Sequence, residues 1–399
     1  MLIASGLPPL KMSKQEPLIY LDNAATTPVV TEVRERMLPW LTGDWGNPSS
    51  RHSLGVKARS AIDRARGQVA HAVGVQPARV VFTSGGTEAN NMAVLGAARA
   101  HKQTGQHILI GPAEHPAVRD PAMALLDEGF TVEVGELASD GSFDVDAFLS
   151  KVRPDTVLVA LMLASNEHGA IYPVARVAAG VRRIAPNAHI HCDAVQALGK
   201  LEVDVIDLGV DTVSISAHKI HGPKGTGALV FAGEARLRPL VFGGGQEGAV
   251  RSGTENVAGI IGFGEAVYLA DRVLESTHAH LIALKQRLAV GLEQIGGMRV
   301  LKPGGEANSL GSIAAVLVSG PPAEVYLHHL EERGVLVSVG SACQAHKNEA
   351  SPALLALGLS ADEARQVLRF SFSRESTEAE VDRALSVLSE LATELAPLA

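Results

Sequence analysis

The 399-residue chain contains only two cysteines, Cys192 and Cys343, and aromatic side chains make up 4% of it. Two thiols are too few for a disulfide framework or for a zinc site built from cysteines. No apolar run reaches the roughly 18 residues that a membrane-spanning helix needs. The first residues lack the basic and apolar stretches of a secretory signal peptide, so we expect a cytoplasmic protein that does not bind a membrane.

Basic residues are also scarce. Lys and Arg number 35 against 43 Asp and Glu, and the formal net charge is −8. Nucleic-acid-binding proteins usually carry a basic patch or stripe, so this balance argues against direct nucleic-acid binding. Glycine and proline occur at ordinary levels, which excludes collagen-like and low-complexity chains.

Short apolar segments alternate with helical patterns over about 200 residues. The segment 156–163 is apolar on both faces, which is typical of a strand buried in a parallel sheet covered by helices. This alternation predicts an α/β fold with a doubly wound, mostly parallel sheet. The expected strands are 80–82, 107–110, 131–134, 156–163, 189–192, 212–216 and 228–231, and the expected helices are 51–73, 88–100 and 175–184.

The pattern changes after Gly264, where longer helices alternate with fewer strands. This part of the chain predicts a smaller α+β domain. The expected helices are 266–295, 323–333, 353–357 and 378–395, and the expected strands are 312–318, 335–339 and 369–372.

The segment 83–90, Thr-Ser-Gly-Gly-Thr-Glu-Ala-Asn, follows one expected strand and opens a helix. Glycines let backbone N–H groups approach an anion, and a helix N-terminus favours negative charge. The segment therefore indicates a phosphate cradle. The alternative is an ordinary helix start, with Thr87 as the N-cap.

Two further positions lie where buried strands are expected to end. Asp193 follows one strand, at the edge where open α/β sheets bind ligands, although an Asp that caps a loop fits equally well. Lys219 follows another strand and precedes a Gly/Pro-rich turn. Such a lysine can be desolvated and become nucleophilic for a Schiff base. The alternative is a surface lysine in a turn.

Two other patterns have weaker support. His189, His191 and Asp193 alternate on one strand face and could chelate a metal, but no further ligand pattern accompanies them, so we predict no metal site. The segment 243–248 matches G-x-G-x-x-G. No amphipathic helix follows it directly, and it comes late in the α/β region, which argues against a dinucleotide site.

The two cysteines have different surroundings. Cys192 lies in an expected apolar strand, which favours a packing role. Cys343 lies in a loop of small and polar residues with His346 and Lys347 nearby. That setting is typical of a reactive thiol, although a tolerated free cysteine is the alternative.

In this order, the motifs resemble those of the class V aminotransferase superfamily, and within it the NifS/IscS-type cysteine desulfurases. The resemblance runs from about Leu18 to Leu395. Its motifs are 20–28 (Tyr-Leu-Asp-Asn-Ala-Ala-Thr-Thr-Pro), 46–50, 84–88, 114–115, 165–169, 193–196, 216–219, 251–254, 341–343 and 369–371. Each motif alone is weak, but the ordered set is highly specific. Pro116 departs from the family pattern, which often has Lys there, and stiffens the segment after His115.

The resemblance implies a pyridoxal 5′-phosphate (PLP) enzyme of fold type I, with a seven-stranded sheet. It implies a catalytic Schiff-base lysine, Lys219, a ring-stacking His115 and a sulfur-accepting Cys343. The PLP-binding residues that it implies are Gly86, Thr87, His115, Asn166, Asp193, Gln196, Ser216, His218, Lys219 and, from the neighbouring subunit, Thr254. Arg369 is expected to bind the substrate carboxylate, with Asn166 assisting.

The resemblance also implies domains and partners. The large PLP-binding domain is expected at 29–276, and the small domain with the Cys343 loop at 15–28 plus 277–399, after a disordered extension at 1–14. The expected reaction converts L-cysteine into L-alanine and a persulfide on Cys343, which passes to a sulfur-acceptor protein for iron–sulfur cluster assembly or thiolation. The expected assembly is a homodimer.

Three alternatives remain open at this point. One is a selenocysteine lyase, which the sequence does not separate from a desulfurase. Another is a different class V PLP lyase or transaminase, which would not need the Cys343 thiol. The third is a non-catalytic binding protein on the same fold, which would not require Lys219, Asp193, His115 and Cys343 together.

Overall fold

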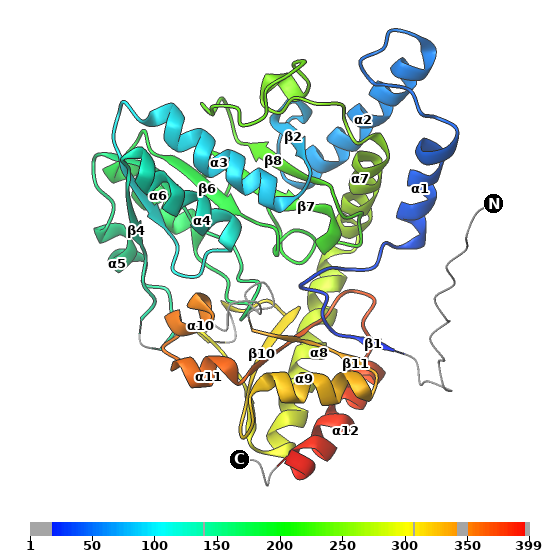
Figure 1. The fold of residues 1–399 in the computed structure, drawn as a ribbon, viewed down its shortest axis with the longest axis vertical. Helices are drawn as coiled ribbons and strands as arrows, with labels where there is room; N and C mark the ends of the chain where they lie inside the picture. Colours follow the sequence, from blue (N-terminus) through cyan, green and yellow to red (C-terminus); the bar gives the residue numbers. More distant parts are fainter. Residues whose placement is uncertain (1–17, 139, 306–307, 341–349, 396–399) are drawn as a thin grey trace, which may run out of the picture.

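The computed structural model describes residues 18–138, 140–305, 308–340 and 350–395 (Figure 1). The strands are β1 (Ile19–Tyr20), β2 (Val80–Thr83), β3 (His107–Ile110), β4 (Thr131–Val134), β5 (Thr156–Ala160), β6 (His189–Asp193), β7 (Thr212–Ser216), β8 (Gly227–Phe231), β9 (Met298–Val300), β10 (Ile313–Val318), β11 (Val335–Leu336), β12 (Ser338–Val339) and β13 (Val367–Ser371). The α-helices are α1 (Thr31–Thr42), α2 (Ser53–Ala72), α3 (Gly86–His101), α4 (Pro116–Ala124), α5 (Val145–Ser150), α6 (Val174–Ile184), α7 (Val257–Asp271), α8 (Leu274–Ile295), α9 (Ala323–Glu332), α10 (Pro352–Ala356), α11 (Ala361–Arg365) and α12 (Glu378–Leu395).

The larger sheet has seven strands in the order β2-β8-β7-β6-β5-β3-β4. Strand β8 runs opposite to the other six strands, which all point the same way. The predicted mostly parallel α/β sheet is therefore confirmed. The expected strand 156–163 ends earlier, at Ala160. The N–H groups of Leu161 and Leu163 still bond to β6 carbonyls, at 3.0 and 2.8 Å, which explains why the apolar run continues beyond the regular ladder.

Helices cover both faces of this sheet. The largest hydrophobic core lies on the face covered by α2, α6 and α7 and includes Ile62, Val181 and Phe263. Smaller cores lie on the face covered by α3 and α4. Burial on both faces explains the continuous apolar strands of the sequence.

A second, four-stranded sheet has the order β12-β13-β10-β9 and is antiparallel throughout. Its core combines side chains of α8, α9 and α12 with Ile19 and Leu21 from the start of the described chain. Figure 1 shows this sheet and its helices below the seven-stranded sheet. Helix α8 continues downward from α7 into this lower part. The domain boundaries at 28/29 and 276/277 stay a prediction, and residues 1–14 lie outside the described residues.

Two of the expected elements are wrong, because each is divided into two in the structure. The helix expected at 266–295 is two helices, α7 and α8, because α7 packs on α1 and α2 while α8 packs on the four-stranded sheet. The strand expected at 335–339 is split as well. Its first half, β11, pairs with β1, and its second half, β12, pairs with β13. Hydrophobic periodicity does not record such a change of packing partner.

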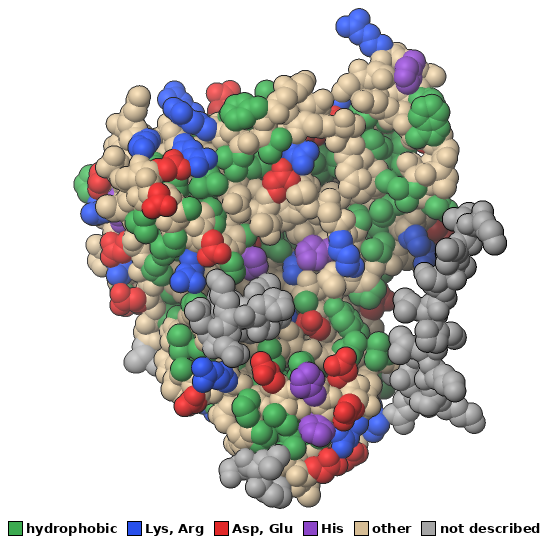
Figure 2. Space-filling model, viewed as in Figure 1, with side chains coloured by type: hydrophobic (Ala, Val, Ile, Leu, Met, Phe, Trp, Pro, Cys, Tyr) green, Lys and Arg blue, Asp and Glu red, His purple; other side chains and the backbone are tan. Residues whose placement is uncertain are grey.

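The face shown in Figure 2 carries Lys and Arg side chains interspersed with Asp and Glu. None of the helices within the described ranges has both the length and the apolar character that crossing a bilayer requires.

Candidate active site

A cavity of about 480 Å³ opens at the carboxyl edge of the seven-stranded sheet. The loops after β2, β3, β5, β6 and β7 all contribute to it, as expected for ligand sites in open α/β sheets. Ten of the predicted site residues line it: Gly86, Thr87, His115, Asn166, Asp193, Gln196, Ser216, His218, Lys219 and Arg369. A larger open groove of about 900 Å³ lies between α1 and α8 and contains none of them. The smaller cavity is therefore the candidate site, because the predicted chemical groups converge there.

The Gly-rich turn after β2 forms one wall of the cavity. Helix α3 begins at Gly86, and Gly85 before it has φ 156° and ψ 179°, a conformation that is essentially restricted to glycine. No side chain caps this helix, so the alternative role of Thr87 as the N-cap is wrong. A Cβ on Gly86 would lie 2.7 Å from Val195 Cγ2. The turn therefore presents uncapped N–H groups to the cavity, as an anion cradle requires.

Lys219 ends a short 3-10 turn (Ala217–Lys219) that follows β7. Its Nζ donates to the carbonyl oxygens of Ala24 and Ala25, at 2.6 and 2.8 Å. The neighbouring His218 is neutral near pH 7, because burial and three nearby lysines lower its pKa to about 4. The interpretation of Lys219 as a surface lysine in a turn is therefore wrong, since its amine points into the cavity wall.

Asp193 is 6% exposed and stands at the end of β6. Its Oδ1 accepts from the backbone N–H of Val195 at 2.9 Å, and its Oδ2 accepts from the side-chain amide of Asn90 at 2.6 Å. The first bond is the turn-capping contact that the sequence allowed. The second bond comes from α3 and was not predicted, although Asn90 ends the Gly-rich motif.

His115 is the N-cap of α4. Its Nδ1 accepts from the backbone N–H of Ala117 at 3.0 Å, and Pro116 occupies the first helical position. Burial lowers the pKa of His115, so the ring is predominantly neutral near pH 7. Because Nδ1 accepts, the neutral ring carries its proton on Nε2. Pro116 thus starts the helix that orients this imidazole.

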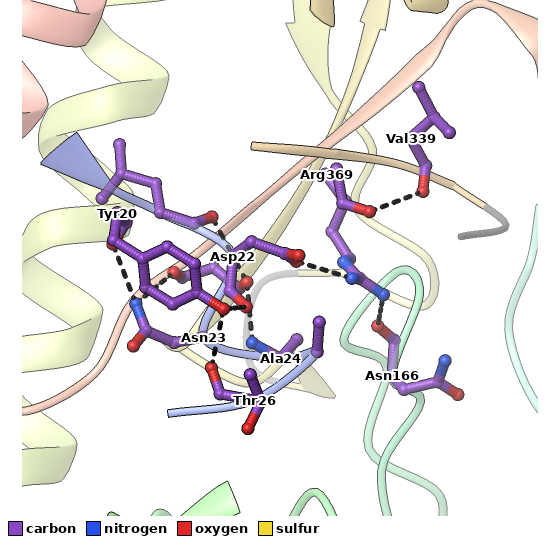
Figure 3. Close-up of polar contacts among 12 residues, drawn as sticks. Tyr20, Asp22, Asn23, Ala24, Thr26, Asn166, Val339 and Arg369 are labelled. Carbon is purple, nitrogen blue, oxygen red and sulfur yellow. Dashed lines mark hydrogen bonds and ion pairs between the residues drawn. The ribbon is translucent and has the colours of Figure 1, made fainter. Parts of the chain in front are cut away.

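Arg369 of β13 is 3% exposed and reaches the cavity from the four-stranded sheet (Figure 3). Its Nη2 donates to Asp22 Oδ1 at 2.8 Å, and its Nη1 donates to the Asn166 backbone oxygen at 3.0 Å. Sequence reasoning expected Asn166 to assist Arg369, and the structure shows this contact through the Asn166 backbone oxygen. Sequence reasoning missed Asp22, which belongs to the conspicuous motif at 20–28.

A buried carboxyl group, that of Glu114, and a partly buried one, that of Glu167, were also missed in the cavity wall. Glu114 accepts from the Met162 N–H at 2.7 Å through Oε1, and burial raises the pKa of its carboxyl well above the usual value. Glu167 accepts a hydrogen bond from Ser351 at the start of α10, and burial raises its pKa to about 7. Glu114 precedes His115 in the sequence, and Glu167 follows Asn166. This proximity to predicted site residues could have indicated both carboxyl groups.

The raised pKa of Glu167 predicts a pH-dependent stability. Because the folded pKa of about 7 exceeds the ordinary 4.5, the folded state favours the protonated acid. The contribution of Glu167 to the free energy of unfolding is then fully present below about pH 4.5. It falls by about 3 kcal/mol as the pH rises through 7. Glu167→Gln is expected to remove most of this fall. The free energy of unfolding at about pH 5 and about pH 8 measures it, with exposed Glu332→Gln as the control; a wild-type slope in Glu167→Gln would contradict the prediction.

The weaker sequence patterns have structural roles. No three His, Cys, Asp or Glu side chains gather in a metal-binding arrangement within the described ranges. The G-x-G-x-x-G segment at 243–248 leads only into a short 3-10 turn (Glu247–Ala249), where Glu247 pairs with Arg66 at 2.7 Å. Cys192 is fully buried in the core, which raises the pKa of its thiol, and packs as predicted.

One predicted residue is not brought to the cavity of its own chain: Thr254 is exposed and does not line it. Cys343 lies outside the described residues, but the flanking residues Gly340 and Pro352 both line the cavity.

The family model described as "Aminotransferase class-V" matches residues 19–384. The chain belongs to the class V aminotransferase family. The chain is 41% identical over 377 residues to the protein named cysteine desulfurase IscS from Anaeromyxobacter dehalogenans, covering 93% of this chain and 92% of that relative. A solved NifS-like protein matches with a TM-score of 0.89 and 34% identity over 95% of this chain and all of the other. The structure titled "SspA in complex with cysteine" matches with a TM-score of 0.77 and 32% identity over 90% and 99%.

The class V aminotransferase family depends on PLP, and the cavity of this chain fits that cofactor. Ser216 Oγ and Gln196 Oε1 are buried there without a hydrogen-bond partner among the described residues. Buried polar atoms of this kind call for a ligand. The uncapped start of α3 suits a phosphate, Asp193 suits a ring nitrogen that carries a proton, and Lys219 supplies the amine.

Proposed function

We propose that this chain is a cysteine desulfurase that converts L-cysteine into L-alanine and leaves a persulfide on Cys343. The family, the relatives named cysteine desulfurase and the likeness to a cysteine-bound structure support this activity. One observation carries the proposal. A single cavity combines Lys219 and Asp193 with Arg369, and its wall holds both ends of the segment that contains Cys343.

Each residue of the cofactor site has a separate role. When bound, PLP supplies an electron sink for charge that develops at the substrate Cα. The N–H groups of Gly86 and Thr87, with Ser216 and His218, hold the phosphate. Asp193 would pair with the ring nitrogen, and His115 would stack on the ring. The Gln196 amide nitrogen, which donates to the Ala24 carbonyl oxygen at 3.0 Å, would use its second N–H for the ring oxygen. Asn166 completes the wall beside Arg369.

Arg369 holds the substrate, and the neutral amine of Lys219 activates it. The Arg369 guanidinium binds the cysteine carboxylate through a two-pronged set of charge-assisted hydrogen bonds. Asp22 and the Asn166 carbonyl already hold that guanidinium in place, so little side-chain freedom is lost on binding. The Lys219 amine then moves the proton of the substrate Cα.

Cys343 follows Gly340 by three residues, a stretch that spans at most about 10 Å when extended. Its thiolate attacks the substrate sulfur, and the carbon–sulfur bond breaks with its electrons returning to carbon. Protonation of that carbon gives alanine, and the sulfur stays on Cys343 as a persulfide. A sulfur-acceptor protein then takes up this sulfur.

Mass spectrometry of the intact protein after incubation with L-cysteine tests the proposal. We expect a gain of one sulfur atom on Cys343 and a stoichiometric yield of alanine. Cys343→Ser should show no gain, while Cys192→Ser, the other thiol in the chain, should behave like the wild type. Full sulfide release by Cys343→Ser would show that the reaction does not pass through this thiol.

We propose that the active unit is a homodimer in which Thr254 reaches the phosphate site of the partner. The exposed Thr254 supports this arrangement, as does Phe242, which is 82% exposed in the same loop region. The adjacent Val241 is also exposed, and neighbouring exposed apolar side chains favour burial against another surface.

The dimer is tested by a charge placed at this surface. Phe242→Asp is expected to shift the sedimentation of the protein from dimer towards monomer and to weaken PLP binding. Val290→Asp on α8, also an exposed apolar position, should leave both unchanged. A Phe242→Asp variant that sediments as wild type would count against this interface.

A further inference from the structure

A column of buried polar side chains runs along the sheet face that α3 covers. In the sheet register, His191 of β6 pairs with Thr212 of β7, and Asp193 pairs with Ser214. Apolar side chains would cover this face without the desolvation cost of polar groups. The column consists of His189, His191 and Asp193 on β6, Thr212 and Ser214 on β7, and Asn90 on α3, all at most 6% exposed.

Asp193 determines the direction of the hydrogen bonds nearest the cavity. The side-chain amide nitrogen of Asn90 donates to Asp193 Oδ2 at 2.6 Å. The amide oxygen of Asn90 therefore lies 2.9 Å from His191 Nε2, and the Ser214 hydroxyl donates to the same oxygen. Because that oxygen only accepts, His191 carries a proton on Nε2.

The remaining bonds follow from the neutrality of the two rings. Burial lowers the pKa of His191 to about 3 and that of His189 to about 4. A neutral ring protonated on Nε2 accepts at Nδ1, so the Thr212 hydroxyl, 3.0 Å away, donates to His191. The Thr212 oxygen in turn accepts from His189 Nε2 at 2.8 Å. Every donor in this series points towards Asp193.

We propose that Asn90, His191, Thr212 and His189 form a positioning relay that holds the Asp193 carboxylate correctly oriented for the ring nitrogen of PLP. Hydrogen bonds in a series polarise one another in a buried environment, so even Thr212 acts on Asp193. This inference rests on the proposed function, since that function assigns Asp193 to the cofactor nitrogen.

The test compares variants along the relay with a matched pair elsewhere in the sheet. Thr156 of β5 is buried and bonds to His107 Nδ1 at 2.7 Å, and none of its hydrogen bonds leads to Asp193. Thr212→Val and Thr156→Val thus remove the same hydroxyl from the same kind of Thr–His pair. Thr212→Ser keeps the hydroxyl and serves as the rescue.

Two properties are measured: the Kd for PLP of the apoprotein and the position of the visible absorption band after loading. We expect Asn90→Ala to raise the Kd about tenfold, or about 1.4 kcal/mol, and Thr212→Val about threefold, each with a shifted band. Thr212→Ser and Thr156→Val should match the wild type. Relay variants that match Thr156→Val in both properties would overturn the inference.

A second measurement uses the apoprotein alone. In protein labelled with ¹⁵N-histidine, we expect the His191 proton on Nε2, protected from exchange, and loss of that protection in Asn90→Ala. A proton on Nδ1 would overturn the inferred direction. Failure of the proposed function is distinguishable, because it would appear as a PLP-loaded wild type that forms no alanine from L-cysteine.

Discussion

Replacement of Lys219 by alanine is expected to lower kcat/KM for L-cysteine by about a thousandfold or more. The variant loses the amine that attaches the cofactor and the base that moves the Cα proton, and general acid–base catalysis alone contributes about 10² to 10⁴. The bonds from Lys219 Nζ to the carbonyl oxygens of Ala24 and Ala25 lie at the cavity wall and not in the hydrophobic core. We therefore expect the fold to persist. We also expect the visible absorption band of the PLP-loaded protein to shift.

Steady-state rates of alanine formation, together with visible spectra, measure this effect. Lys57→Ala is the control, since Lys57 is an exposed lysine that pairs with Asp44 at 2.7 Å, and neither residue lines the cavity. A Lys219→Ala variant that keeps more than about a tenth of the activity would refute the role of Lys219 as the reacting amine.

Replacement of Arg369 by methionine is expected to raise KM for L-cysteine about a hundredfold. Methionine keeps much of the length of the side chain but loses the two N–H donors that fit a carboxylate, and hydrogen bonds to charged groups are each worth about 1.5–3 kcal/mol. Arg369→Lys should restore little of this loss, because an ammonium group lacks the planar fork. PLP binding should stay near the wild-type level, since Arg369 is assigned to the substrate.

The control for Arg369 is Arg333→Met. Arg333 also bonds to a carboxylate, Glu394, at 2.7 Å, but on the outer surface of the smaller sheet's helices. If both variants changed KM equally, or if Arg369→Met lost PLP instead of substrate affinity, the assignment of Arg369 to the substrate carboxylate would be wrong.

The ordered motifs of the chain were sufficient to predict most of the cavity wall. Asp193, Ser216 and Lys219 all follow continuous apolar segments, and such segments become buried parallel strands whose ends meet at one edge. The neighbours of these residues were harder to predict. Asn90, Asp22 and Glu167 stand within the same motifs, yet their contacts join segments 103 to 347 positions apart in the sequence.

The amino-acid sequence by itself determined the α/β fold class and the burial of Cys192, because these follow from local periodicity. The ordered motifs, through their family resemblance, pointed to Lys219 and Asp193, and both line the cavity. Only the tertiary structure decided where α7 ends and α8 begins, that Asp22 holds Arg369, and that His189 and His191 both bond to Thr212. These features depend on which surfaces pack together. Hydrogen-bond direction in the Asp193 column likewise depends on partners from α3 and β7, which no spacing along β6 can specify.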